Sequence, residues 1–345
     1  YIEDMQGRRY MDFHGNNVHQ VGFANSEVIA AVKKQLDDLP FCTRRYTNRV
    51  AVDLARKLAQ IAPANLNKSL FCPGGAEAVG MAVKLARVAT GRHKTISMWD
   101  SFHGATLDTI SIGGEAIFRQ DMGPLLPGTE HVPPPDEYRC VFGCAERGGC
   151  DLVCANYIEY VLQKEGDIAA VISEPIRSTP YIPKPEYWQK VREACDRHGA
   201  LLIFDEIPHA LGRTGKMFTF ENFVDAPDIV VIGTGLGGGI MPLAAIIADE
   251  DLDVAADRAM GHYTHEKSPV ACSAALATIE YIETHSLAQH ARELGKHALD
   301  RLKQMMERHP LIGDVRGLGL FLGIELVKSR ETRERASDEA EAVMY

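Results

Sequence analysis

The sequence lacks a long hydrophobic run. No uninterrupted apolar stretch in its 345 residues approaches the roughly 20 residues that a membrane-spanning helix requires. Its first ten residues, YIEDMQGRRY, lack the basic-then-apolar pattern of a secretion signal. Basic residues are the minority, and the formal net charge of -10 argues against nucleic acid or an anionic membrane surface as the main partner. The eight scattered cysteines, without a secretion signal, indicate reduced thiols. We therefore expect a cytoplasmic protein.

The spacing of apolar residues predicts an α/β fold. Apolar runs of strand length at 168–173, 200–204 and 229–232 alternate with helical patterns such as 186–198. This alternation is typical of a mainly parallel sheet with helices on its faces. The same rules predict a long loop at 113–135 and further elements along the chain. The expected helices are 26–36, 50–61, 78–89, 151–164, 268–283 and 287–309; the expected strands are 69–72, 94–98 and 243–248; residues 315–327 are expected to form a strand or hairpin.

A glycine-dense turn separates two of the apolar runs. Residues 229–241 read IVVIGTGLGGGIM, with four glycines in the five positions 235–239, and a second apolar run begins at Leu243. Only glycine adopts a positive φ without strain and lets another group come close to the main chain. We therefore expect a close backbone approach here, with Thr234 held at the mouth of the turn.

Three other segments place chemically useful residues where strands are expected to end. Residues 73–78, PGGAEA, open into a helical pattern, and backbone N–H groups at a helix start bind phosphate. Residues 99–104, WDSFHG, offer either a stacking face for a planar ligand or a packed corner of the core. Asp205 ends an apolar run, so its carboxylate is expected to be buried and to need a cationic or hydrogen-bonding partner. Asp205 and Thr234 both fall beyond carboxyl ends of strands, where ligands of parallel sheets bind.

Four cysteines, Cys140, Cys144, Cys150 and Cys154, cluster with C-x3-C-x5-C-x3-C spacing. Four thiols this close can bind zinc tetrahedrally. The pairs are not C-x2-C, however, and the last cysteine falls where a helix is expected to begin. Reduced thiols without a metal are therefore favoured over structural zinc.

Taken together, these motifs resemble those of class III aminotransferases, which are pyridoxal-phosphate (PLP) enzymes of fold type I. The resemblance covers nearly the whole chain in the family's order. The matching segments are 74–78, 102–104, 205–207 and 212–215. The resemblance implies that the backbone of Gly74, Gly75 and Ala76 binds the cofactor phosphate. It also implies that Phe102 and His103 stack on the cofactor ring and that Asp205 pairs with the ring nitrogen. Thr264 matches a threonine that reaches the phosphate from a partner subunit, which implies a homodimer with shared sites.

The main departure from the family pattern is Thr234. Family members read KGxGGG where this chain reads TGLGGG from Thr234, and that lysine forms the Schiff base with the cofactor and moves the Cα proton. Neither Lys216 nor Lys267 occupies the motif position. We expect a protein that binds PLP without a covalent link and is nearly inactive. A substitution made to trap an intermediate, a natural variant with altered chemistry and a non-catalytic homologue are the three explanations.

A second departure is Pro208, where most family members have a glutamine. The segment DEIPHALGRTGKMF resembles a subgroup that includes PLP-dependent ammonia-lyases and phospho-lyases acting on phosphorylated or phosphonate amines. Arg177 is a candidate for binding such an anion. Arg44 and Arg45 are weaker candidates, and a solvated surface role suits them at least as well.

The resemblance implies a division into residues 1–25, an N-terminal segment of the small domain; 26–269, a large PLP-binding domain; and 270–345, a small C-terminal α+β domain that ends early. It implies an enzyme that acts on a small primary amine carrying a phosphonate, phosphate or carboxylate. Transamination is the family default, and elimination of ammonia or phosphate is the alternative. A nicotinamide-dependent oxidoreductase is disfavoured, because the glycines of 235–239 lead into an apolar strand and not into a dinucleotide-binding helix.

Overall fold

A seven-stranded sheet forms the centre of the protein in the computed structural model, which describes residues 1–144, 146–178 and 180–344. Its strand order is β3-β9-β8-β7-β6-β4-β5. Strands β5, β4, β6, β7 and β8 are parallel neighbours, whereas β9 is antiparallel to both β8 and β3. The predicted mainly parallel sheet is confirmed. The bounds are β3 Leu66–Cys72, β4 Lys94–Met98, β5 Thr129–Val132, β6 Ile168–Ser173, β7 Leu201–Asp205, β8 Ile229–Ile232 and β9 Ala244–Asp249.

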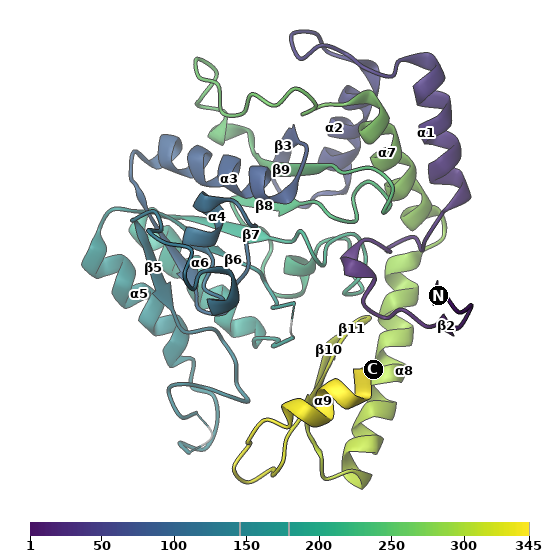
Figure 1. Ribbon diagram of the computed structural model, residues 1–345. Helices are drawn as coiled ribbons and strands as arrows, with labels where there is room; N and C mark the ends of the chain where they lie inside the picture. The colour runs from purple at the N-terminus through teal and green to yellow at the C-terminus, as the bar shows by residue number, and fades with distance from the viewer. Residues whose placement is uncertain (145, 179, 345) are drawn as a thin grey trace.

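Helices cover both faces of this sheet (Figure 1). In β8, Ile229 and Val231 belong to the apolar cluster that includes α3, while Val230 and Ile232 belong to the larger cluster with α2, α5, α6 and α7. Both sets are buried because successive strand residues point to opposite faces of the sheet. The helices that pack around the sheet are α1 Ser26–Asp38, α2 Arg49–Ile61, α3 Gly75–Thr90, α4 Leu107–Ile112, α5 Val153–Glu165, α6 Pro185–His198 and α7 Pro269–Thr284.

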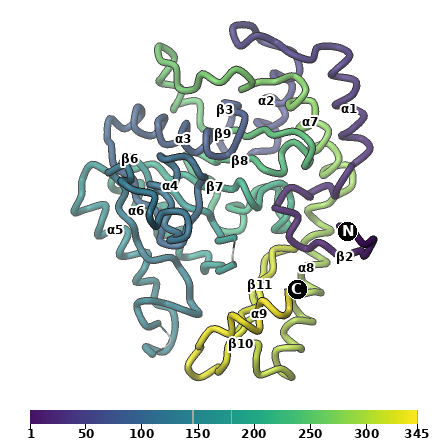
Figure 2. Tube along the Cα trace, viewed as in Figure 1, coloured from purple at the N-terminus to yellow at the C-terminus, as the bar shows by residue number. Residues whose placement is uncertain are grey.

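The C-terminal part forms a separate lobe below the sheet in Figures 1 and 2. Its long helix α8 (Leu287–Arg308) contacts both strands of an antiparallel hairpin, β10 (Ile312–Leu318) and β11 (Phe321–Leu326), and α9 (Ser337–Met344) contacts β11. Of the strand or hairpin expected at 315–327, the structure has the hairpin, and its first strand begins earlier, at Ile312. Helix α7 instead packs against α1 and α2. The division of the chain at residues 25 and 269 stays a prediction.

The expected loop at 113–135 is wrong in part. The structure places a short 3-10 helix at Ala116–Phe118 and the edge strand β5 at Thr129–Val132 within it. Strand β5 reads TEHV, and only Val132 is buried. An edge strand needs no apolar run, so hydrophobic patterning does not reveal it.

The N-terminal segment carries a second small element, a two-stranded antiparallel pair of β1 (Ile2–Glu3) and β2 (Arg9–Tyr10). A 3-10 helix at Gly15–Asn17 follows and lies at the central cavity described below. In the described ranges, no helix is long and apolar enough to cross a membrane.

Candidate active site

A cavity of about 590 Å³ opens beyond the carboxyl ends of the parallel strands. Asp205 is the last residue of β7, Glu174 directly follows β6, and Thr234 lies two residues after β8. Parallel strands bring these ends to one edge of the sheet. The cavity is lined by seven of the residues predicted from the sequence: Gly75, Ala76, Phe102, His103, Arg177, Asp205 and Thr234.

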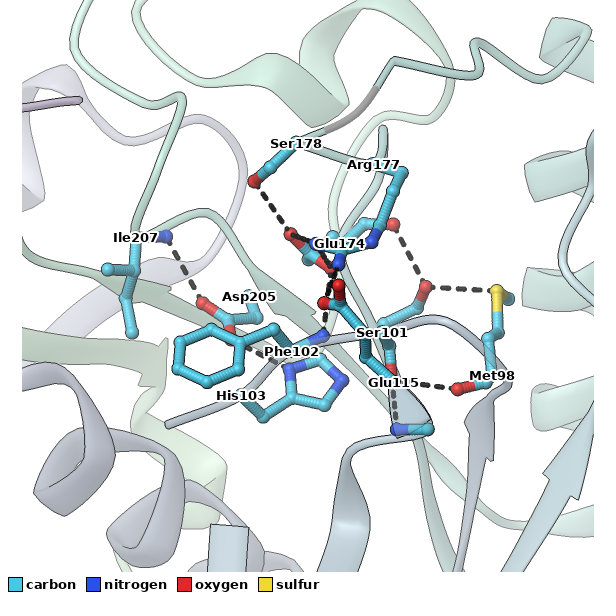
Figure 3. Close-up of polar contacts among 12 residues, drawn as sticks. Met98, Ser101, Phe102, His103, Glu115, Glu174, Arg177, Ser178, Asp205 and Ile207 are labelled. Carbon is cyan, nitrogen blue, oxygen red and sulfur yellow. Dashed lines mark hydrogen bonds and ion pairs between the residues drawn. The ribbon is translucent and has the colours of Figure 1, made fainter. Parts of the chain in front are cut away.

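Asp205 and His103 form the buried polar pair of the cavity. The Asp205 carboxylate is 1% exposed, and its Oδ2 lies 2.8 Å from Nδ1 of His103. The backbone N–H of Ile207 donates to Oδ1 over 3.1 Å. Figure 3 shows the His103 ring turned toward this carboxylate beside Phe102. His103 is therefore the partner that burial of Asp205 requires, while its own buried Nε2 has no hydrogen-bond partner among the described residues.

The amino end of α3 faces the same cavity. Gly74 is the N-cap, no side chain caps this helix, and Gly75 and Ala76 line the cavity. A Cβ on Gly75 would lie only 2.8 Å from Cδ1 of Ile207, so a side chain here would push the turn away from the strand ends. First-turn N–H groups and the positive end of the helix dipole therefore remain available to an anion.

Phe102 and Phe118 wall another side of the cavity. Their ring centroids are 4.4 Å apart, and Phe102 is half-buried. Phe102 thus keeps part of its ring accessible to a planar ligand. The stacking face considered from the sequence is compatible with this arrangement, and Phe118 was not anticipated.

Arg177 is the one lysine or arginine that lines the cavity in the described part of the chain. Its Nη1 lies 3.2 Å from Oε2 of Glu174, and its Nη2 contacts Glu115. Burial acts to lower the pKa of Arg177, but the two carboxylates outweigh it and hold the pKa above its ordinary value. Burial also raises the pKa of Glu174, although Arg177 opposes that shift.

Thr234 lines the cavity in an unusual backbone conformation. Its φ is +38°, in a region that β-branched residues avoid because the side chain collides with the backbone. Gly237 in the same turn is required by space, since a Cβ there would meet the backbone carbonyl oxygen of Met241 at 1.8 Å. The close backbone approach expected for this turn is therefore confirmed. Within the described residues, no lysine lines the cavity.

Four predicted residues do not line this cavity: Gly74, which is the N-cap of α3, and three others. Thr264 is exposed on the loop before α7, and Arg45 is exposed. Arg44 pairs with Glu266, with 2.9 Å between Nε and Oε1, and donates to the carbonyl of Gly261. Arg44 therefore stabilises the loop that carries Thr264 and does not face the site.

Glu174 and Glu115 are functional candidates that the sequence analysis missed. Glu174 directly follows a strand of six buried residues, which is the same signal that identified Asp205. Glu115 lies 62 residues from Arg177 in the sequence, and no local pattern predicts their contact. Asn16, Asn17 and Ser178 also line the cavity without a prior signal.

The four clustered cysteines lie apart from this site around a small void of about 20 Å³. The Sγ atoms of Cys140 and Cys144 are 2.9 Å apart. Burial raises the pKa of Cys144 and of Cys154 to about 12, which favours the protonated thiol. Among the described residues, no group of three or more His, Cys, Asp or Glu side chains is placed to hold a metal ion.

Comparison with known proteins agrees with this geometry. The family description Aminotransferase class-III matches residues 1–343. The chain is 49% identical to the (R)-1-hydroxy-2-aminoethylphosphonate ammonia-lyase of Vibrio splendidus (strain 12B01), over 100% of this chain and 75% of that protein. It is 39% identical to the leucine/methionine racemase of Thermococcus litoralis, over 100% of this chain and 79% of that protein.

The structure is also similar to that of the taurine:2-oxoglutarate aminotransferase of Bifidobacterium kashiwanohense, solved in complex with PLP and glutamate. The TM-score is 0.89 and the identity 30%, over 96% of this chain and 77% of the other. The sheet, its flanking helices and the cavity at the strand ends define a PLP-dependent enzyme of fold type I. The chain belongs to the class III aminotransferase family, and it is an enzyme of the transaminase or lyase type.

The residues of the cavity fit the cofactor of this family, pyridoxal phosphate. The amino end of α3 suits its phosphate, because no side chain caps the first-turn N–H groups of this helix. The buried Asp205 carboxylate suits a protonated ring nitrogen, and the partly accessible ring of Phe102 suits a planar face.

Proposed function

We propose that this protein acts on a small primary amine that carries a phosphonate, phosphate or carboxylate group, and that it eliminates ammonia from it. The observation that carries the anionic group of the substrate is Arg177, a buried cation in the wall of the cavity. A guanidinium binds such oxyanions in a bidentate manner. The identity of 49% with an ammonia-lyase whose named substrate is an aminophosphonate supports the same choice. Transamination of such an amine is the second candidate, supported by the family as a whole.

In this proposal each side chain has a defined task. Gly74, Gly75 and Ala76 bind the cofactor phosphate with backbone N–H groups, and Phe102 covers one face of the ring. Asp205 holds a proton at the ring nitrogen, and His103 orients the carboxylate through its 2.8 Å contact. The chemistry that PLP supplies when bound is an electron sink for the carbon next to the substrate amine. Arg177 orients the substrate through its anionic group.

We also propose that Thr234 occupies the position of the Schiff-base lysine. Its place in the turn after β8 and on the cavity wall supports this. Thr234 has no amine with which to link the cofactor or to move the Cα proton, so the protein is expected to be nearly inactive as it stands. An engineered substitution, a natural variant and a non-catalytic homologue all remain explanations of this residue.

A homodimer with shared sites is part of the proposal. Thr264 is exposed and lies outside the cavity of its own chain, as a residue that completes a partner's site must. The cytoplasmic location stays a prediction.

The test is the Thr234→Lys enzyme, loaded with PLP and offered a panel of aminophosphonates, phosphorylated amines and amino acids. Release of free ammonia without a keto-acid acceptor supports the lyase. Strict dependence on an acceptor such as pyruvate supports the transaminase instead. No activity with any amine would refute both and favour a non-catalytic homologue.

A further inference from the structure

Two carboxylates contact the guanidinium of Arg177, and the structure holds them very differently. The Glu174 side chain is 3% exposed and has three polar neighbours. It contacts Nη1 of Arg177, accepts from Oγ of Ser178 over 3.1 Å, and accepts from the backbone N–H of Phe102 over 3.4 Å. Glu174 is therefore a fixed, buried counter-ion.

Glu115 has none of this support. Its side chain is 34% exposed, and Nη2 of Arg177 is its one polar partner in the described part of the chain. It lies between α4 and the 3-10 helix Ala116–Phe118, of which it is the N-cap. An exposed carboxylate held at one point regains solvation and side-chain freedom when it leaves, so its displacement costs little.

Arg177 itself is buried in the wall of the cavity. Its side chain is 6% exposed, and its Nε is buried without a partner among the described residues. An unpaired N–H in a buried guanidinium is unfavourable and is satisfied by an incoming oxyanion. The open donor and the loosely held Glu115 therefore point to one binding place for an anionic group.

The charges make the two occupants mutually exclusive. Glu174 and Glu115 both contact the single guanidinium of Arg177, so the cluster already has an excess of acidic groups over cations. A substrate phosphonate would add to it, and like charges at contact distance repel strongly where water is excluded. We propose that Glu115 is the specificity-determining residue of this cavity, because its carboxylate competes with the anionic group of the substrate for Arg177. This inference rests on the proposed function, which places the substrate in the same cavity.

The competition predicts which amines Glu115 disfavours. An anionic amine binds only when Glu115 has left Arg177, so its affinity includes the cost of breaking that ion pair. An amine of similar size without an anionic group has nothing to pair with Arg177, so its affinity does not include this cost. The Glu115–Arg177 pair thus sets the difference in affinity between an amine that carries an anionic group and one that does not.

The test measures binding to the PLP-loaded protein by calorimetry, with 2-aminoethylphosphonate as the amine that carries an anionic group and ethanolamine as the amine that lacks one. We expect Glu115→Gln to lower the Kd for 2-aminoethylphosphonate about fivefold, the upper range for a partly exposed ion pair, and to leave the Kd for ethanolamine within about twofold. Glu115→Asp should give a smaller change in the same direction, because a shorter side chain contacts Arg177 less well. The control is Glu307→Gln, which removes the same charge from an exposed position on α8.

An unchanged or weaker affinity of Glu115→Gln for 2-aminoethylphosphonate would overturn the inference, as would an equal gain for both amines. So would a gain of the same size in Glu307→Gln, since net charge alone would then explain it. These results do not depend on turnover. A Thr234→Lys enzyme that processes no amine would refute the proposed function while leaving the competition for Arg177 measurable.

Discussion

Nδ1 of His103 lies 2.8 Å from Oδ2 of Asp205, and neither side chain is more than 2% exposed. The two residues come from different segments, one after β4 and one at the end of β7. Folding therefore brings His103 against Asp205. Without His103, Oδ2 of the buried Asp205 carboxylate would have no hydrogen-bond partner. The contact has a structural role, and its role in holding the cofactor is part of the proposed function.

Replacing His103 by Phe keeps a ring in this place and removes the contact with Asp205. A buried hydrogen bond to a charged group contributes about 1.5–3 kcal/mol, so we expect the free energy of unfolding in urea to fall by that order. PLP affinity should fall as well, because Asp205 loses its orientation. In a double-mutant cycle with Asp205→Asn, the combined loss should be smaller than the sum of the single losses. Additive losses would show that the two side chains act independently.

Borohydride reduction tests the covalent state of the cofactor. We expect the protein as it stands to bind PLP reversibly and to lose it on gel filtration, because Thr234 has no amine. Peptide mass spectrometry after reduction should find no lysine that carries the cofactor, whereas Thr234→Lys should carry it at position 234. Recovery of the modification at Lys216 or Lys267 in the unmodified chain would contradict the prediction.

The backbone of Thr234 predicts a stability effect. At φ +38° a β-branched residue is strained, and asparagine tolerates this region much better. We expect Thr234→Asn to raise the free energy of unfolding of the cofactor-free protein by about 1 kcal/mol. The matched control is Thr43→Asn at an exposed position whose φ is not positive, where we expect little change. Equal effects at both positions would argue against strain at Thr234.

Glu206 predicts a dependence of stability on pH. Burial raises its pKa to about 8, while its two backbone hydrogen bonds, from the N–H groups of Thr219 and Phe220, act to lower it. The ordinary value is 4.5, so the folded state binds this proton more tightly than the unfolded state. The contribution is fully present below pH 4.5 and is lost as the pH rises to about 8.

We therefore expect Glu206→Gln to be less stable than the parent at pH 5, because the amide cannot accept both backbone hydrogen bonds. The difference should narrow as the pH rises toward 8. The measurement is urea unfolding of both proteins across this range. A difference that widens with pH would contradict the raised pKa.

The sequence predicted the interior of the sheet because its strands are apolar on both faces. All six residues of β6 and all four of β8 are buried, so each reads as a continuous apolar run. Strand β5 escaped prediction because it lies at the edge and buries only Val132. A continuous run of apolar residues therefore indicates a strand that is buried on both faces, and it does not indicate an edge strand.

The site was predictable where a single segment carries the signal. Asp205 at the end of a strand and Gly75 at the start of a helix are both local features, and both line the cavity. Glu174 carried the same strand-end signal and was overlooked. The contact between Glu115 and Arg177 has no local signal, because it arises only when two distant segments meet. Thr264 followed from family resemblance alone, and its role stays a prediction.

The antiparallel placement of β9 has a consequence for engineering this enzyme. Strands β8 and β9 are hydrogen-bonded neighbours, so the turn that carries Thr234 begins and ends on adjacent strands of the same sheet. Both ends of the turn are fixed by buried strands, and a Cβ on Gly237 would collide with the backbone of Met241. A new side chain at position 234 should therefore emerge from an unchanged main-chain path. Chemistry at this position can be exchanged one functional group at a time, without redesign of the surrounding backbone.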